Sequence, residues 1–168
     1  LTKVEATRGY GARIELGGAA FDDALARARE ICAEEGSVFI SPFDDEDVIA
    51  GQGTLGLEVL EQLADPDLVI VPCGGGGLIS GTAIAIHEQR PATRIVGVQA
   101  EACAPFVASL AAGAVTAAAS AGTIADGIAV KRPGEITFPL VQQYVEQMLT
   151  VDDEQIAAAM TLLVERQK

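Results

Sequence analysis

Apolar residues follow two spacings along the chain, and the two spacings alternate. Repeats of three or four positions predict helices, and short runs of apolar or β-branched residues predict strands. We expect helices over residues 21–34, 54–64, 78–89, 138–147 and 153–165. We expect strands over residues 13–16, 38–40, 68–71, 95–98 and 148–151. Gly36 and Pro91 end two of these helices, and Asp152 provides an N-cap for the last.

This alternation predicts the fold class. Several of the expected strands are apolar on both faces, as in a parallel sheet that is covered by helices. The sequence therefore indicates an α/β fold with a parallel sheet flanked by helices, and there is no internal repeat.

Composition narrows the function. The 168 residues carry 24 Asp and Glu against 11 Lys and Arg, a net charge of −13, which argues against binding to nucleic acid or anionic membranes. An anionic ligand must then be held by local donors. The three cysteines show no metal-binding spacing and are typical of reduced thiols in a cytoplasmic protein. The chain has no initiating Met, and we expect it to be an internal fragment.

The candidate chemistry is a run of glycines, Gly74 to Gly77, in "DLVIVPCGGGGLISG". It follows an expected strand and opens an expected helix, where ligands bind in open α/β sheets. Backbone N–H groups and the helix N-terminus can hold a phosphate there without Lys or Arg. The alternative is a flexible turn. A P-loop is excluded because no Lys follows, and the dinucleotide-binding spacing does not fit.

Four motifs carry a family resemblance. These are "ATRGYGA" (6–12), "PFDDEDVIAGQGTLGLEVLEQ" (42–62), "VPCGGGGLISG" (71–81) and "TIADGIAV" (123–130). Together they resemble the threonine/serine dehydratases that depend on pyridoxal 5'-phosphate (PLP), a fold type II group similar to tryptophan synthase β. The resemblance covers essentially the whole chain.

The resemblance implies a set of cofactor-binding residues. Gly74, Gly75, Gly76, Gly77 and the N–H of Leu78 would hold the PLP phosphate. Gly127 would lie beside the cofactor ring and contact it through its backbone. Phe43 would line the cofactor and substrate side. Serine racemases typically have Asn at the position of Phe43, so Phe favours a dehydratase.

The resemblance also implies that no catalytic residue lies in this chain. The family's lysine that binds PLP covalently lies before residue 1, and Lys3, Lys131 and Lys168 match no such motif. We therefore expect the isolated chain to be inactive. Residues 1–44 would belong to a smaller, mobile α/β domain and residues 45–168 to the large PLP-binding domain.

No metal site is expected. Some relatives bind a divalent cation through a Glu and an Asp, and the aligned positions here are Gln99 and Pro105, with Cys103 between them. Mg²⁺ and Ca²⁺ require hard oxygen ligands.

Other polar residues have simpler interpretations. His87 fits a helix C-terminus, and Cys73 fits a buried filler. The acids at 44–47 fit a solvated turn, Thr54 a helix start, and Asp126 either the positioning of Gly127 or a local turn bond.

Three functions remain open. The first is part of a PLP-dependent lyase that converts L-threonine, and L-serine, to 2-oxobutanoate or pyruvate and ammonia. Such an enzyme would belong to amino-acid metabolism, including isoleucine biosynthesis, and would be a cytoplasmic homo-oligomer. The second is a serine racemase-type enzyme. The third is a non-catalytic module that binds a phosphate ligand.

Overall fold

The computed structural model describes residues 2–18, 21–119 and 122–167. The chain divides into two compact units, Leu1–Ile40 and Ser41–Lys168. The boundary lies four positions before the one expected from sequence. No helix in the described part of the chain is long and apolar enough to cross a membrane.

The first unit is helical in its described residues. It contains α1 (Thr2–Gly9) and α2 (Phe21–Glu35), and α2 ends at Gly36, whose φ is +67°. The strands predicted at 13–16 and 38–40 are wrong: both segments are irregular. Arg13 pairs with Glu35, so the first segment is held to α2 by its side chains and not by a neighbouring strand.

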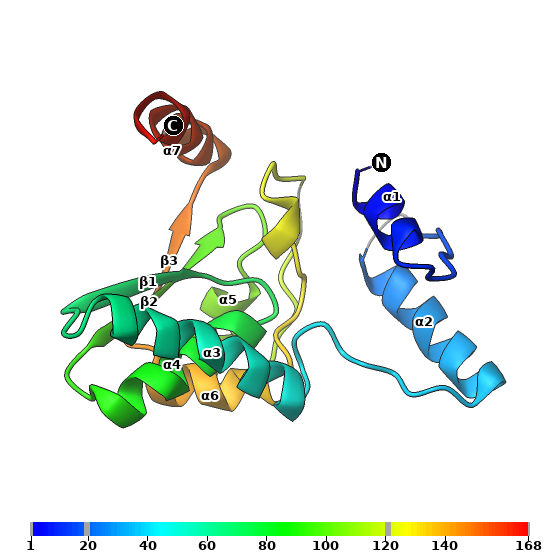
Figure 1. Cartoon of the computed structure of the whole chain (residues 1–168), viewed down its shortest axis with the longest axis horizontal. Helices are drawn as coiled ribbons and strands as arrows, with labels where there is room; N and C mark the ends of the chain where they lie inside the picture. The colour runs from blue at the N-terminus through cyan, green and yellow to red at the C-terminus, as the bar shows by residue number, and fades with distance from the viewer. Residues whose placement is uncertain (1, 19–20, 120–121, 168) are drawn as a thin grey trace. The chain divides into compact units, whose positions relative to one another are not determined.

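The second unit is built on a three-stranded parallel sheet in the order β1-β2-β3 (Figure 1). The strands are β1 (Leu68–Pro72), β2 (Arg94–Ala100) and β3 (Gln147–Val151). β1 and β2 pair with Leu68 opposite Arg94, and β2 and β3 with Val96 opposite Gln147. The predicted parallel sheet is thus confirmed.

Helices α3 (Glu46–Gln62), α4 (Gly77–Gln89) and α6 (Thr137–Tyr144) lie together on one side of the sheet (Figure 1). The others are α5 (Pro105–Ala112) and α7 (Asp153–Arg166), and a short 3₁₀ turn, η1, spans Asp126–Ile128. α7 begins at the predicted Asp152, whose side chain accepts from the Gln155 N–H in a capping box. α6 ends three residues before its predicted end, and β3 follows.

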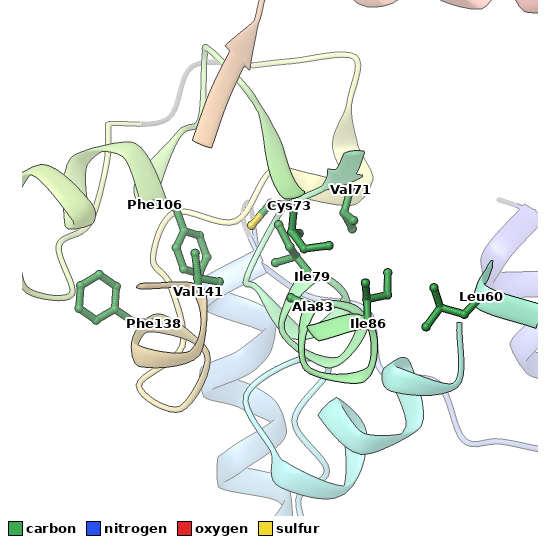
Figure 2. Close-up of a cluster of buried hydrophobic side chains, with 10 residues drawn as sticks. Leu60, Val71, Cys73, Ile79, Ala83, Ile86, Phe106, Phe138 and Val141 are labelled. Carbon is green, nitrogen blue, oxygen red and sulfur yellow. The ribbon is translucent and has the colours of Figure 1, made fainter. Parts of the chain in front are cut away.

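The core lies between the sheet and α4 (Figure 2). Ile79, Ala83 and Ile86 of α4 are fully buried, and Phe106 and Val141 close the cluster from α5 and α6. β1 is buried on this face only, because its alternate residues Leu68 and Ile70 are exposed. The expectation of strands buried on both faces is therefore wrong for β1 in the described structure.

Helix α3 begins eight residues before the predicted start. Asp45 is its N-cap and accepts hydrogen bonds from the N–H groups of Asp47 and Val48. Thr54 consequently lies inside the helix, with its hydroxyl bonded to the Gly51 carbonyl, and does not start it. Gly53, which precedes the predicted start, and Gly56 are both buried against α4.

Candidate functional site

The glycine run forms the junction between β1 and α4, at the carboxyl edge of the sheet. The last β1-to-β2 bond runs from the Cys73 N–H to the Val98 carbonyl, and the chain then leaves the sheet. Gly76 is the N-cap of α4 and has φ +99°, a left-handed conformation that favours glycine. The Gly76 carbonyl accepts the first bond of the helix, from Ser80 N–H.

The glycines of this junction are buried residues, except for Gly74, which is half-buried. Gly75, Gly76 and Gly77 are all buried residues. Among the described residues, no hydrogen bond has the N–H of Gly74, Gly75 or Gly76 as its donor. The first N–H groups of α4 also lack acceptors within the helix. Buried N–H groups normally have a partner, so this cluster fits an anionic ligand such as a phosphate monoester.

Each glycine of the run is also packed closely. A Cβ at Gly76 would lie 2.6 Å from Phe106 Cζ and 2.7 Å from Thr137 Oγ1. At Gly74 it would lie 3.1 Å from Ile128 Cα, and at Gly77 2.9 Å from the Phe43 backbone. The run is therefore a packed loop, and the flexible turn does not describe it.

Two further predicted residues lie around this loop. The Phe43 ring packs on Gly75, where a Cβ would come within 2.5 Å of the ring carbons. Gly127 is exposed in η1, with open space where a Cβ would point, and its neighbour Ile128 contacts Gly74. The structure thus brings Phe43, the glycine run and the 123–130 loop together, while their binding of cofactor stays a prediction.

Asp44 and Thr137 are the residues that sequence reasoning missed. Asp44 was expected in a solvated turn, but its carboxylate accepts from the N–H groups of Glu135, Ile136 and Thr137 at the start of α6. The Thr137 hydroxyl donates to the Gly75 carbonyl at 2.7 Å. A spacing of 91 to 93 positions leaves no local signal for the Asp44 contacts.

Gln99, one of the positions considered above for a metal ligand, has hydrogen-bond partners within the protein. Its side chain is fully buried, donates to the Cys73 carbonyl and accepts from the N–H groups of Phe106 and Val107. Pro105 stands in the first turn of α5. The described residues contain no group of three or more His, Cys, Asp or Glu side chains that could hold a metal ion.

Cys73 and His87 play no visible chemical part. Burial raises the pKa of the Cys73 thiol to about 12, so the thiolate is scarce at neutral pH, as a filler role requires. His87 lies in the last turn of α4, away from the glycine run at its start, and packs edge-on against Tyr144 with ring centroids 5.3 Å apart.

The chain matches known proteins along its whole length. The family model of the pyridoxal-phosphate dependent enzymes matches residues 1–168. L-threonine ammonia-lyase of Thermotoga maritima is 47% identical over 100% of this chain and 42% of its own length. L-threonine dehydratase catabolic TdcB of Escherichia coli is 46% identical over 99% of this chain and 51% of its own. The chain thus spans about half the length of the curated relatives that it matches.

Solved structures of related enzymes resemble this chain as well. A threonine deaminase from T.th. superposes with a TM-score of 0.91 and 38% identity, over 99% of this chain and 56% of that one. Maize serine racemase superposes with a TM-score of 0.91 and 36% identity, over 98% of this chain and 52% of its own. The parallel sheet with flanking helices is that of the fold type II enzymes. On the strength of the family match over every residue, the chain belongs to the pyridoxal-phosphate dependent enzymes.

Proposed function

We propose that the protein carrying this chain is a PLP-dependent lyase that converts L-threonine, and L-serine, to 2-oxobutanoate or pyruvate and ammonia. The relatives named threonine ammonia-lyase or threonine dehydratase support this, at 45–48% identity. The observation that carries it is the pair of N–H groups of Gly75 and Gly76, which belong to buried residues, have no hydrogen-bond partner among the described residues and stand at a helix N-terminus.

In this proposal the chain grips the cofactor and contributes one wall of the site. The N–H groups of Gly74 to Gly77 and Leu78 donate to the phosphate, helped by the partial positive charge of the α4 N-terminus. Phe43 closes one side and excludes water, and Gly127 presents its backbone to the ring. When bound, PLP withdraws electrons from the α-carbon of the amino acid. This chain supplies no catalytic side chain.

We also propose a compartment, an assembly and a domain division for the enzyme. Cys32, Cys73 and Cys103 are all free thiols, which supports a reducing, cytoplasmic compartment. A homo-oligomer is proposed for the complete enzyme. Unit Leu1–Ile40 would be part of the smaller, mobile domain, and unit Ser41–Lys168 part of the large PLP-binding domain.

A matched pair of substitutions tests the phosphate grip. Gly75→Asp and Gly75→Asn add side chains of nearly equal size, so both displace the Phe43 ring to a similar extent. Only Asp adds a negative charge beside the phosphate. At an effective dielectric of about 20, two unit charges ~4 Å apart repel by about 4 kcal/mol. We therefore expect Gly75→Asp to bind PLP up to about a thousandfold more weakly than Gly75→Asn.

The measurement is equilibrium dialysis of PLP against the protein that carries this sequence. Equal affinities of the two variants would place the phosphate elsewhere. A parallel assay of wild-type protein with L-threonine and L-serine separates the candidate reactions. Racemised serine without 2-oxobutanoate or pyruvate would favour a racemase, the activity named for the maize structural neighbour. Cofactor binding without turnover would favour the non-catalytic module.

A further inference from the structure

We propose that Asp44 and Thr137 are positioning residues of the glycine loop, and that Thr137 sets the direction of the Gly76 N–H. The inference rests on the proposed cofactor site. It assigns the shape of that site to two side chains that do not touch the ligand.

Asp44 fixes the start of α6 from a distant part of the chain. Its Oδ1 accepts from the N–H groups of Ile136 at 2.8 Å and Thr137 at 3.3 Å. Its Oδ2 accepts from Glu135 N–H at 3.0 Å. A carboxylate at a helix N-terminus is favoured by both its charge and these bonds. Gly134 leaves room for it, since a Cβ there would collide with the carboxylate.

Thr137 links that helix start to the glycine loop. Its side chain is fully buried. The hydroxyl donates to the Gly75 carbonyl at 2.7 Å and accepts from Gly134 N–H at 3.1 Å, so both of its roles are used. Gly134 N–H also reaches the Gly75 carbonyl, at a longer 3.3 Å.

The hydrogen bond to the Gly75 carbonyl also fixes the direction of the Gly76 N–H. The Gly75 carbonyl and the Gly76 N–H belong to one planar peptide group, which is trans here. In a trans peptide the two bonds point in opposite directions. A hydroxyl that holds the carbonyl on the α6 side therefore directs the N–H to the other side, where the proposed phosphate binds.

Thr137→Val and Thr137→Ser test this directly. Val keeps the shape and removes the hydroxyl, whereas Ser keeps the hydroxyl. We expect Val to raise the Kd for PLP about tenfold, the equivalent of one lost hydrogen bond. Ser should stay within about threefold of wild type. Both are measured by equilibrium dialysis on the protein that carries this sequence, with urea unfolding alongside.

The chain offers a matched control in Thr93. This side chain is also buried, and its hydroxyl donates to the Pro66 carbonyl at 2.8 Å, in the loop before β1. Thr93→Val should lower the free energy of unfolding about as much as Thr137→Val and leave the Kd for PLP unchanged. If Thr93→Val weakens PLP as much, or if Thr137→Val binds like wild type, the positioning role is refuted.

Asp44 is tested against another capping aspartate. Asp44→Ala and Asp152→Ala each remove a carboxylate from a helix N-terminus, at α6 and α7. Only Asp44→Ala should raise the Kd for PLP, by about tenfold, and equal Kd values would overturn its role.

The Gly75→Asp and Gly75→Asn pair separates failure of the positioning role from failure of the proposed phosphate site. If that pair differs while Thr137→Val has no effect, the phosphate site stands and the positioning fails. If the pair does not differ, the proposed site itself fails.

Discussion

One aromatic residue, Phe43, covers two glycines of the loop, and it does so with different atoms. A Cβ at Gly75 would meet the ring carbons of Phe43. A Cβ at Gly77 would meet the Cα, Cβ and carbonyl oxygen of the same residue, at 2.9 Å. Ring atoms can be removed by substitution, whereas backbone atoms cannot.

This difference predicts a selective rescue. Gly75→Ala and Gly77→Ala should each cost about 1–3 kcal/mol of unfolding free energy through overpacking. Adding Phe43→Ala should relieve Gly75→Ala and leave Gly77→Ala uncorrected. Urea unfolding of the two double mutants and the three single mutants measures the coupling. Equal coupling in both pairs would contradict the packing described.

At the residue scale, the sequence predicts the glycine loop but not Asp44 and Thr137, the residues that hold it. Four glycines behind an apolar run mark the loop that we propose to bind phosphate, because a local pattern carries the signal. Asp44 and Thr137 leave no such pattern. The Asp44 contacts span 91 to 93 positions and the contact of Thr137 with Gly75 spans 62, and an acid within "DDED" is most simply solvated.

At the scale of the elements, α3 and α4 approach each other through glycines. A Cβ at Gly56 would lie 2.8 Å from the Thr82 carbonyl oxygen, and one at Gly53 would lie 3.2 Å from that of Gly81. Gly51, in the same helix, has nothing within 4 Å of its Cβ position. Two glycines of α3 therefore serve packing, and the third does not.

A pair of alanine substitutions in α3 should thus have opposite effects. Gly51→Ala should stabilise the protein by about 0.5–1 kcal/mol, because alanine is the better helix former. Gly56→Ala should destabilise it by about 1–3 kcal/mol, since the backbone of α4 must move. Urea unfolding gives both values, and a Gly56→Ala variant as stable as Gly51→Ala would disprove the close approach.

The same glycines explain the missed start of α3. The glycines of "GQG" (51–53) disfavour a helix, but the close packing of Gly53 and Gly56 against α4 outweighs that cost. The false strands at 13–16 and 38–40 fail for the complementary reason. β-branched residues favour a strand only where a neighbour pairs with it, and Val38 and Ile40 lie exposed without one in the described structure.

At the scale of the whole molecule, the boundary between the units follows from Asp44. Its three bonds to α6 attach the loop after Ser41 to the second unit, which explains why the division lies at Ile40 and not at residue 44. Just before it, Val38 is 86% exposed and Ile40 is 71% exposed.

Limited proteolysis of the 168-residue chain should therefore cut first between residues 36 and 41. Exposed irregular backbone is cleaved before helices and strands. With a protease of broad specificity, mass spectrometry should find a persistent fragment that begins near Ser41. First cuts within β1, α4 or the glycine loop would contradict the division.

The grip proposed here is made of main-chain donors, and this changes how mutagenesis would report it. A scan that only truncates side chains to alanine leaves glycines out, and the glycines that would hold the phosphate have no side-chain atoms to delete. Such a scan would pass over the donors and respond at Asp44 and Thr137 instead. The scan would identify the residues that position the loop and would not identify the donors that contact the phosphate. Only substitutions that add atoms, at Gly74 to Gly77, would mark the ligand's place.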